Sequence, residues 1–199
     1  CFLVQVDEYK KSDVIFDSDY VYFSSFSSSW LAHSKRYVEA MTERFGLNAQ
    51  SLVIEVASND GYLLQYFVEK QIPVLGIEPT TNTAAAAIKK GVTTITRFFG
   101  TELARELAEQ GTRADLLLGN NVLAHVPDIV DFVAGMAILL KPDGVVTMEF
   151  PHLMRLVENN QFDTIYHEHF SYLSLFTVSR IFTAAGLRVF DVEQLSTHG

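Results

Sequence analysis

Residues 52–64 constrain the fold of this chain more than any other stretch. They read Leu-Val-Ile-Glu-Val-Ala-Ser-Asn-Asp-Gly-Tyr-Leu-Leu. The apolar and mostly β-branched start is typical of a strand buried on both faces. The loop 58–61 supplies N-cap side chains and a glycine, after which apolar residues recur at helical spacing. A strand, a tight loop and a helix direct backbone N–H groups toward the carboxyl end of the strand, so this stretch predicts a ligand cradle.

Strands and helices alternate along the rest of the chain. The pattern predicts strands at 51–57, 73–78, 92–96, 114–118, 144–150 and 187–192, and helices at 60–69, 79–90, 101–110, 127–140 and 174–185. Strands separated by helices of about ten residues form parallel sheets with right-handed crossovers. We therefore predict an α/β fold with a doubly wound, mostly parallel sheet.

The first fifty residues have a different pattern. Residues 1–6 alternate loosely and predict an edge strand, and the polar residues 10–19 predict a loop. Residues 20–29 mix aromatic and hydroxyl side chains without helical period, and by residue type alone they favour a serine-rich connection. Residues 30–45 predict an amphipathic helix that Gly46 ends. We predict a connecting segment and helix over 1–50, and a ligand-binding domain over 51–199.

The composition excludes several classes of protein. With 199 residues and 48% hydrophobic content, the chain can bury the core of one main domain. A formal charge of −9 argues against a nucleic-acid partner, which would need basic patches. The longest apolar run, 134–140, is too short to span a membrane, and no signal peptide opens the chain. Cys1 is the only cysteine, so no internal disulfide forms, and we expect a cytoplasmic location.

The cradle differs from that of a dinucleotide-binding protein. Of the expected G-x-G-x-x-G glycines only the last is present, as Gly61. Glu78 ends the second predicted strand, 17 residues later. There it is either a solvated strand end or a carboxylate that accepts the hydroxyls of an adenosine ribose. We regard the ribose contact as at least as well supported.

Two more clusters follow the third and fourth predicted strands. Phe98 and Phe99 are core residues or the walls of an adenine site. Asn120 and Asn121 form a turn or hold an amino-acid headgroup. Because strand ends meet at one edge of a parallel sheet, a nucleoside with an amino-acid tail fits these features better than a dinucleotide does. The predicted cofactor-binding residues are Ala57, Ser58, Asn59, Gly61, Glu78, Pro79, Phe98, Phe99, Asn120 and Asn121.

Residues 166–172, Tyr-His-Glu-His-Phe-Ser-Tyr, concentrate ionisable and hydroxyl groups after the fifth predicted strand. One interpretation is a metal site at His167, Glu168 and His169, but no further ligand is evident and we predict none. A second is a polar loop. A third, which we prefer, is a general base with an orienting partner. A positioned histidine can take up a proton near neutral pH, an effect worth roughly 10²–10⁴-fold in rate.

Several motifs resemble a known family. Residues 55–61, 76–78 and 119–127 resemble the motifs of class I S-adenosylmethionine-dependent methyltransferases, which have a Rossmann-like fold. The chain is more narrowly similar to the C-methyltransferases that act on nucleotide-linked 4-keto deoxysugars. That similarity covers essentially the whole chain and is carried by the motifs at 20–25, 150–152, 162–172 and 196–199. It implies S-adenosylmethionine as cofactor and a nucleotide-sugar substrate.

The resemblance also implies roles for individual residues. It makes His169 the leading base, and it turns 20–29 from a connection into an active-site lid. For His125 the residues alone favour a helix-start position before Pro127, and the resemblance implies a catalytic role instead. The full set of catalytic residues that it implies is His169, Glu168, Tyr166, His125, Tyr20 and Tyr22.

Relatives of this kind carry more chain at both ends. They have an N-terminal zinc module of Cys-x-x-Cys pairs, and Cys1 stands where the last of its thiolates would be. A lone cysteine cannot hold zinc, so we expect zinc only in a longer protein. The motif at 196–199 would lead into a last strand, so we expect a domain truncated before that strand. Two alternatives stay open: an O- or N-methyltransferase with the same cradle, and a non-catalytic nucleotide- or metal-binding module.

Overall fold

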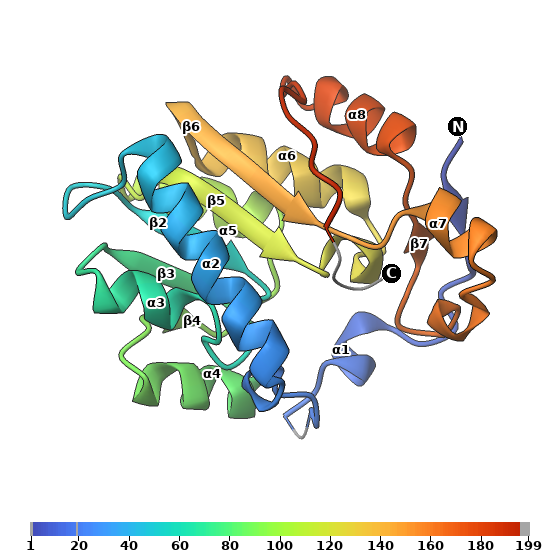
Figure 1. Cartoon of the computed structure of the whole chain (residues 1–199), viewed down its shortest axis with the longest axis horizontal. Helices are drawn as coiled ribbons and strands as arrows, with labels where there is room; N and C mark the ends of the chain where they lie inside the picture. Colours follow the sequence, from blue (N-terminus) through green and yellow to red (C-terminus); the bar gives the residue numbers. More distant parts are fainter. Residues whose placement is uncertain (1, 19, 196–199) are drawn as a thin grey trace.

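A computed structural model describes residues 2–18 and 20–195 of the chain. Its centre is a parallel sheet in the order β4-β3-β2-β5-β6 (Figure 1). The strands are β2 (Val53–Val56), β3 (Val74–Ile77), β4 (Thr94–Ile95), β5 (Ala114–Asn120) and β6 (Leu140–Glu149). The chain steps outward from β2 through β3 to β4, and then returns to the other side of β2 as β5. This arrangement confirms the predicted α/β class and places a topological switch point between β2 and β5.

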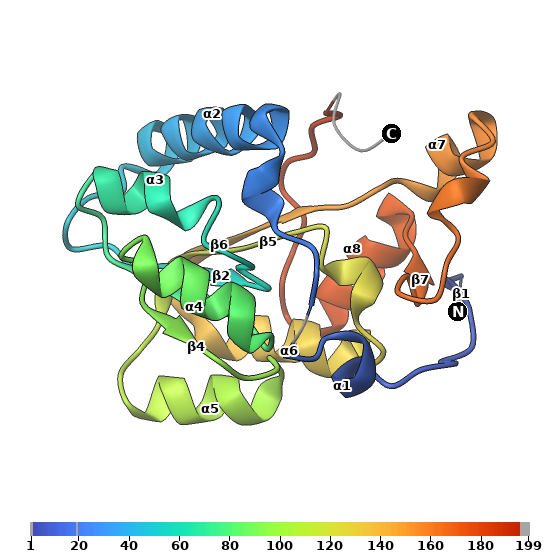
Figure 2. The same cartoon turned by 90° about the horizontal axis from the view of Figure 1, so that it is seen from below.

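Helices cover both faces of this sheet (Figures 1 and 2). α2 (Ser28–Phe45) and α3 (Leu64–Glu69) pack on one face, together with Ala87 of α4 (Thr81–Lys89). α5 (Thr101–Glu109), α6 (Ile129–Leu139) and α8 (Leu175–Ala184) pack on the other. The sheet is therefore doubly wound, as predicted. Because α2 is one of its covering helices, the segment 1–50 contributes to the core.

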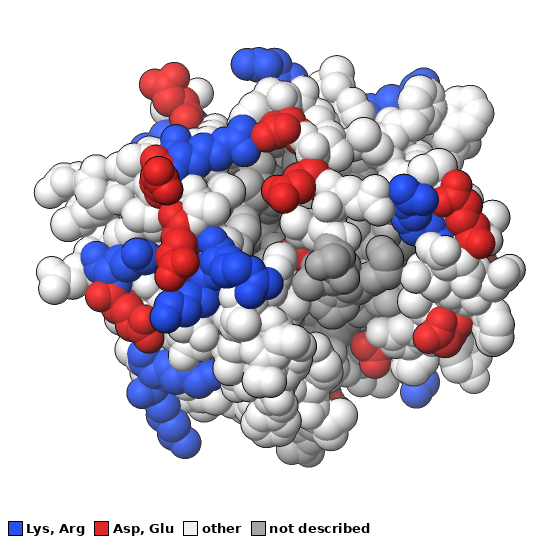
Figure 3. All heavy atoms as spheres, in the orientation of Figure 1, with Lys and Arg blue, Asp and Glu red and all other residues white. Residues whose placement is uncertain are grey.

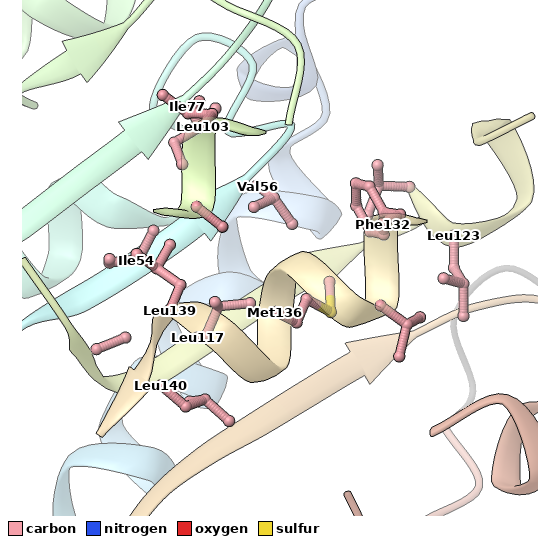
Figure 4. Close-up of a cluster of buried hydrophobic side chains, with 14 of the residues drawn as sticks. Ile54, Val56, Ile77, Leu103, Leu117, Leu123, Phe132, Met136, Leu139 and Leu140 are labelled. Carbon is pink, nitrogen blue, oxygen red and sulfur yellow. The ribbon is translucent and has the colours of Figure 1, made fainter. Parts of the chain in front are cut away.

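The central strand β2 is buried on both sides. Val53, Ile54, Glu55 and Val56 are each 0% exposed. Side chains alternate across a strand, so Val53 packs with α2 and α3 while Ile54 and Val56 pack with the opposite helices (Figure 4). Burying each apolar side chain contributes about 1.5–3 kcal/mol. The predicted burial of this strand on both faces is confirmed.

Most predicted helices form, with shifted ends. α2 ends at Gly46, which takes a left-handed conformation with φ +61°, as its predicted role requires. α3 begins at Leu64 rather than at residue 60, because residues 58–63 form a turn instead. α6 begins at Ile129, where the Asp128 side chain accepts the N–H of Asp131. The residues before Ile129 therefore lie outside the helix, at the carboxyl edge of the sheet.

The chain contains short elements that the sequence pattern did not predict. They are α1 (Ser12–Ile15), α7 (Leu153–Glu158), β7 (Ser171–Tyr172) and the 3-10 turns at Ser24–Phe26, Leu123–His125 and Phe162–Thr164. The predicted edge strand at 1–6 forms as β1 (Val4–Gln5), but it pairs antiparallel with β7 in a separate two-stranded sheet. Residues 10–19 are not simply a loop, since α1 lies within them.

The predicted sixth strand at 187–192 is wrong. Residues 187–195 have no regular structure and are not paired with β6. Side chains hold this segment instead, because Arg44 of α2 pairs with Asp191 at 2.7 Å and lies over the ring of Phe190 at 5.8 Å. A period-two pattern predicts an extended backbone but not the strand that it would pair with. Cys1 and the motif at 196–199 lie outside the described residues.

The charged side chains on the face seen in Figure 3 are mixed in sign. Lysine and arginine side chains lie among aspartate and glutamate side chains rather than in one basic stripe. Among the residues that the structure describes, no helix combines the length and apolar character needed to cross a membrane.

Candidate active site

A cavity of about 950 Å³ opens at the carboxyl ends of the sheet strands. It lies at the switch point between β2 and β5, the position where doubly wound sheets bind ligands. Of the predicted site residues, all but Ser58 and Gly61 line it. They are Tyr20, Tyr22, Ala57, Asn59, Glu78, Pro79, Phe98, Phe99, Asn120, Asn121, His125, Tyr166, Glu168 and His169. One cavity therefore joins the predicted cofactor residues to the predicted base cluster.

The loop after β2 has an unusual backbone. Ala57 and Asn59 have φ +55° and +48°, in the left-handed region that costs a residue with a Cβ about 1 kcal/mol or more. Gly61 also has positive φ, and a Cβ there would lie 3.1 Å from Ala87 of α4. Gly61 is thus required for packing against α4 rather than for lining the cavity. Ser58 is fully buried behind the loop.

Glu78 is held in place by the cradle. It is only 4% exposed and accepts the backbone N–H of Asn59 at 2.8 Å. Its other oxygen accepts the N–H and the hydroxyl of Thr80, at 2.9 and 2.6 Å. Burial raises the pKa of Glu78, and the hydrogen bonds from Thr80 and Asn59 oppose that shift. Since a carboxylate can accept about four hydrogen bonds, Glu78 keeps acceptor capacity for a ligand hydroxyl.

The next strand ends supply amides and aromatic rings. Asn121 is left-handed with φ +54°, and its side-chain oxygen is buried and has no hydrogen-bond partner within the described chain. Asn120 precedes it in the wall of the cavity. Phe99 packs edge-on against Phe132 with ring centres 5.3 Å apart, while Phe98 is 48% exposed. Side-chain amides and an apolar wall are thus both present at these strand ends.

His169 is the centre of the acid–base cluster. Its Nδ1 lies 2.8 Å from the carbonyl oxygen of Thr164. A carbonyl can only accept, so Nδ1 carries the hydrogen and Nε2 has the free lone pair in the neutral ring. The ring centre of His169 lies 4.4 Å from that of Tyr166 and 4.6 Å from that of His125. Burial lowers the pKa of His169, which favours the neutral form.

His125 is also neutral. Burial, followed by the neighbouring His169, lowers the pKa of His125 to about 4. Its Nδ1 is buried and has no partner within the described chain. The ring of Phe16 packs edge-on against it, with centres 5.9 Å apart. Two neutral imidazoles therefore lie side by side in the wall of the cavity, and the exposed His167 does not line it.

Tyr20 and Tyr22 line the same cavity as the base cluster. Burial, then the charge of Glu168, raises the pKa of Tyr20, so its hydroxyl stays protonated and can donate. Tyr22 is more open, at 52% exposure. The backbone carbonyl of Tyr20 accepts the side-chain N–H of Asn82 at 2.7 Å, and that of Tyr22 accepts the side-chain N–H of Asn59 at 3.0 Å.

Several residues of the cavity were missed from the sequence. Phe16 and Ser12 reach it from α1, in a segment predicted to be a loop. Trp30 and Tyr62 line it and stack, with ring centres 5.8 Å apart. The apolar residues Val14 and Ile15 before Phe16, in an otherwise polar stretch, were a signal that could have predicted a short helical turn there. Trp30 fitted the apolar face of a helix, so nothing marked it as a site residue.

No metal centre forms in this region. Among residues 2–18 and 20–195, the structure contains no group of three or more histidine, cysteine, aspartate or glutamate side chains that could hold an ion.

The sheet order, the helices on both faces and the cavity at the switch point define a class I Rossmann-like fold of the S-adenosylmethionine-dependent methyltransferase type. Residues 30–192 match the family described as a methyltransferase domain, and the chain belongs to this family. The solved structure of magnesium protoporphyrin IX methyltransferase from Synechocystis PCC 6803, with bound SAH, shares the fold. Its TM-score is 0.64 at 16% identity, over 84% of this chain and 77% of the other.

Two curated relatives are similar in sequence. The chain is 40% identical to the C-methyltransferase NovU of Streptomyces niveus over all 199 residues, which is 47% of that protein. It is 27% identical over 118 residues to a ubiquinone biosynthesis O-methyltransferase of Rhodopseudomonas palustris, over 55% of this chain and 46% of the relative. The chain thus spans about half the length of these relatives.

Proposed function

We propose that the protein is an S-adenosylmethionine-dependent C-methyltransferase. Its substrate would be a nucleotide-linked 4-keto deoxysugar, methylated on a carbon next to the ketone. The observation that carries this proposal is that Glu78 and Asn121 line the same cavity as His169 and His125. The similarity to a C-methyltransferase along the full 199 residues supports the same class of reaction.

The charges of the cavity suit a cationic cofactor. Acidic side chains line it at Glu78, Asp128, Asp131, Asp163 and Glu168, and no lysine or arginine is among the described residues of the lining. S-adenosylmethionine carries a sulfonium, which an acidic wall stabilises. A diphosphate finds no cation there, so we expect the sugar ring rather than the nucleotide to enter this cavity.

The residues that would hold the cofactor follow from their positions. Glu78 would accept the ribose hydroxyls, Asn120 and Asn121 would bind the amino-acid end, and Phe99 would flank the adenine. When bound, S-adenosylmethionine supplies an electrophilic methyl group. The remaining task of the protein is to generate a nucleophilic carbon beside it.

His169 is the proposed base. Its Nδ1–H is fixed by the Thr164 carbonyl, so Nε2 can take a proton from the carbon next to the ketone. The C–H electron pair moves toward the ketone oxygen and forms an enolate. The hydroxyls of Tyr20 and Tyr22 would donate to that oxygen, and Glu168 would stabilise the imidazolium that forms. The nucleophilic carbon would then form the new C–C bond to the methyl group as the S–CH₃ bond breaks, which would leave that electron pair on the sulfur of SAH and restore the ketone.

The test uses S-adenosylmethionine labelled with ¹³C in its methyl group. The full-length protein is incubated with dTDP-, UDP- and GDP-linked 4-keto-6-deoxyhexoses, and the product is examined by NMR. A ¹³C label coupled to a ring carbon supports the proposal. A label on oxygen or nitrogen supports the alternative methyltransferase classes, and stoichiometric metal without transfer supports a binding module.

A further inference from the structure

The segment that carries Tyr20 and Tyr22 is fastened to the cofactor cradle. Asn82 of α4 donates to the Tyr20 carbonyl at 2.7 Å. Two residues on, Asn59 of the cradle loop donates through Nδ2 to the Tyr22 carbonyl at 3.0 Å. Its Oδ1 accepts the backbone N–H of Ser24 at 2.9 Å. Side chains of the cradle and of α4 thus fix the backbone of a segment that lies more than thirty positions earlier in the sequence.

Asn59 stands at the junction of two parts of the site. It is only 8% exposed, and its own N–H donates to Glu78, the carboxylate proposed to bind the ribose. Its side chain points the other way, to the tyrosine segment. Its left-handed backbone, φ +48°, is one that asparagine tolerates better than most residues. One residue therefore contacts both the cofactor side and the substrate side.

The two backbone groups that Asn59 meets require an amide. A backbone N–H can only donate and a carbonyl can only accept. A side chain that satisfies both must therefore offer one acceptor and one donor, as an amide does and a carboxylate does not. This pairing also fixes which atom of Asn59 is the oxygen. The contact is specific in chemistry as well as in shape.

We infer that Asn59 is a positioning residue for Tyr22, and that its side chain serves the substrate end of the cavity rather than the cofactor. Asn82 performs the same task for Tyr20. The inference rests on the proposed function only in giving the tyrosine hydroxyls a substrate oxygen to bind. It predicts that a ligand bound to Glu78 lowers the mobility of the segment around Tyr20 and Tyr22, because the N–H of Asn59 donates to Glu78.

The test compares Asn59→Asp with Asn59→Gly in the full-length protein. Both residues tolerate the left-handed backbone. Aspartate keeps an acceptor for Ser24 but turns an oxygen toward the Tyr22 carbonyl, and glycine removes both contacts. Asn48→Asp is the matched control, because the exposed Asn48 donates to the Gly46 carbonyl at 3.0 Å and does not line the cavity.

Three quantities are measured: SAH affinity by calorimetry, amide hydrogen exchange over 20–26, and kcat and KM with a substrate found as described above. Loss of a buried hydrogen bond should speed amide exchange in 20–26 about tenfold in both Asn59 variants. Turnover should fall about tenfold, while SAH affinity stays within about twofold of the wild type. Asn48→Asp should change none of the three.

An SAH affinity that falls by the same factor as kcat/KM, with unchanged exchange over 20–26, would make Asn59 a cofactor ligand and overturn the inference. Asn82→Ala gives a second reading should either Asn59 variant fail to fold. Asn82→Ala should speed amide exchange around Tyr20 and leave SAH affinity intact. Exchange around Tyr20 at the wild-type rate would also overturn the inference. Exchange and SAH affinity require no substrate, so failure to find a methyl acceptor would count against the proposed function alone.

Discussion

The two ends of the cavity are built in different ways. The proposed cofactor end is made by loops that directly follow strands of the sheet, and Glu78 and Asn59 there are 4% and 8% exposed. Apart from His125, the proposed substrate end is made by segments outside the sheet, around α1 and around residues 161–169, and Tyr22 and Tyr166 there are 52% and 41% exposed. On the proposed function, the sheet would fix the cofactor while surface segments would shape the site for the substrate.

Because of this difference, we expect cofactor affinity and turnover to depend on different residues. Substitutions at the substrate end should remove turnover and leave cofactor affinity in place. Substitutions at the cofactor end should weaken affinity first. The following predictions test that separation, beginning with the largest expected effect.

His169→Asn should lower kcat by roughly 10²–10⁴-fold, because a positioned base contributes that much to proton transfer. SAH affinity, measured by calorimetry, should not change. His167→Asn is the matched control, since His167 is exposed and does not line the cavity. Wild-type turnover in His169→Asn would remove the assignment of the base.

Glu78→Ala should weaken SAH binding about tenfold to a hundredfold, because hydrogen bonds to a charged group are among the stronger ones. Calorimetry measures this directly, with the exposed Glu109→Ala as control. At saturating cofactor the variant should keep much of its kcat. Unchanged SAH affinity would show that Glu78 only braces the cradle loop.

The pH dependence of kcat/KM should report His169. The base acts when neutral, so activity should rise with pH as the ring loses its proton. Since burial lowers the pKa of His169, the acid limb should lie below the ordinary histidine value of about 6.5. The residual activity of His169→Asn should lack this limb. A midpoint above the ordinary value would mean that another group governs it.

Lys90→Met should have the smallest effect, on stability. Lys90 lies 3.0 Å from Asp60, a carboxylate that is 1% exposed and also accepts a hydrogen bond from the hydroxyl of Ser25. Removing the lysine leaves that buried group with a weaker set of partners, at a cost of about 1–3 kcal/mol. Thermal unfolding should show a lower Tm than for Lys89→Met, whose lysine is exposed.

The contrast between the strand ends and the segments outside the sheet also explains how much could be predicted from the sequence. The β-branched run at 52–57 and the alternation of strands with helices correctly predicted the five parallel strands, because burial on both faces leaves a strong pattern. The strand ends then located Glu78 and the asparagines. The sequence could not show that Ala57 and Asn59 adopt left-handed backbones, or that the Asn59 amide contacts the Tyr22 carbonyl. Neither feature produces a periodic pattern of residues.

The substrate end depended on resemblance rather than on pattern. Tyr20, Tyr22 and His125 have no periodicity that marks a site, and Phe16 lay in a predicted loop. The error at 187–192 has the related cause that alternation predicts an extended chain but not its partner. Contacts between distant segments, such as Arg44 with Asp191, are set by tertiary packing.

The central claim is that His169 removes a proton from carbon before the methyl group is transferred. The most direct measurement is hydrogen exchange at the carbon next to the ketone, followed by NMR in D₂O. The full-length protein is given a nucleotide-linked 4-keto-6-deoxyhexose together with SAH, which cannot donate a methyl group. Exchange should occur in the wild type and be lost in His169→Asn. Exchange at the wild-type rate in His169→Asn, or transfer of a methyl group to that carbon with no exchange at all in the wild type, would contradict the account.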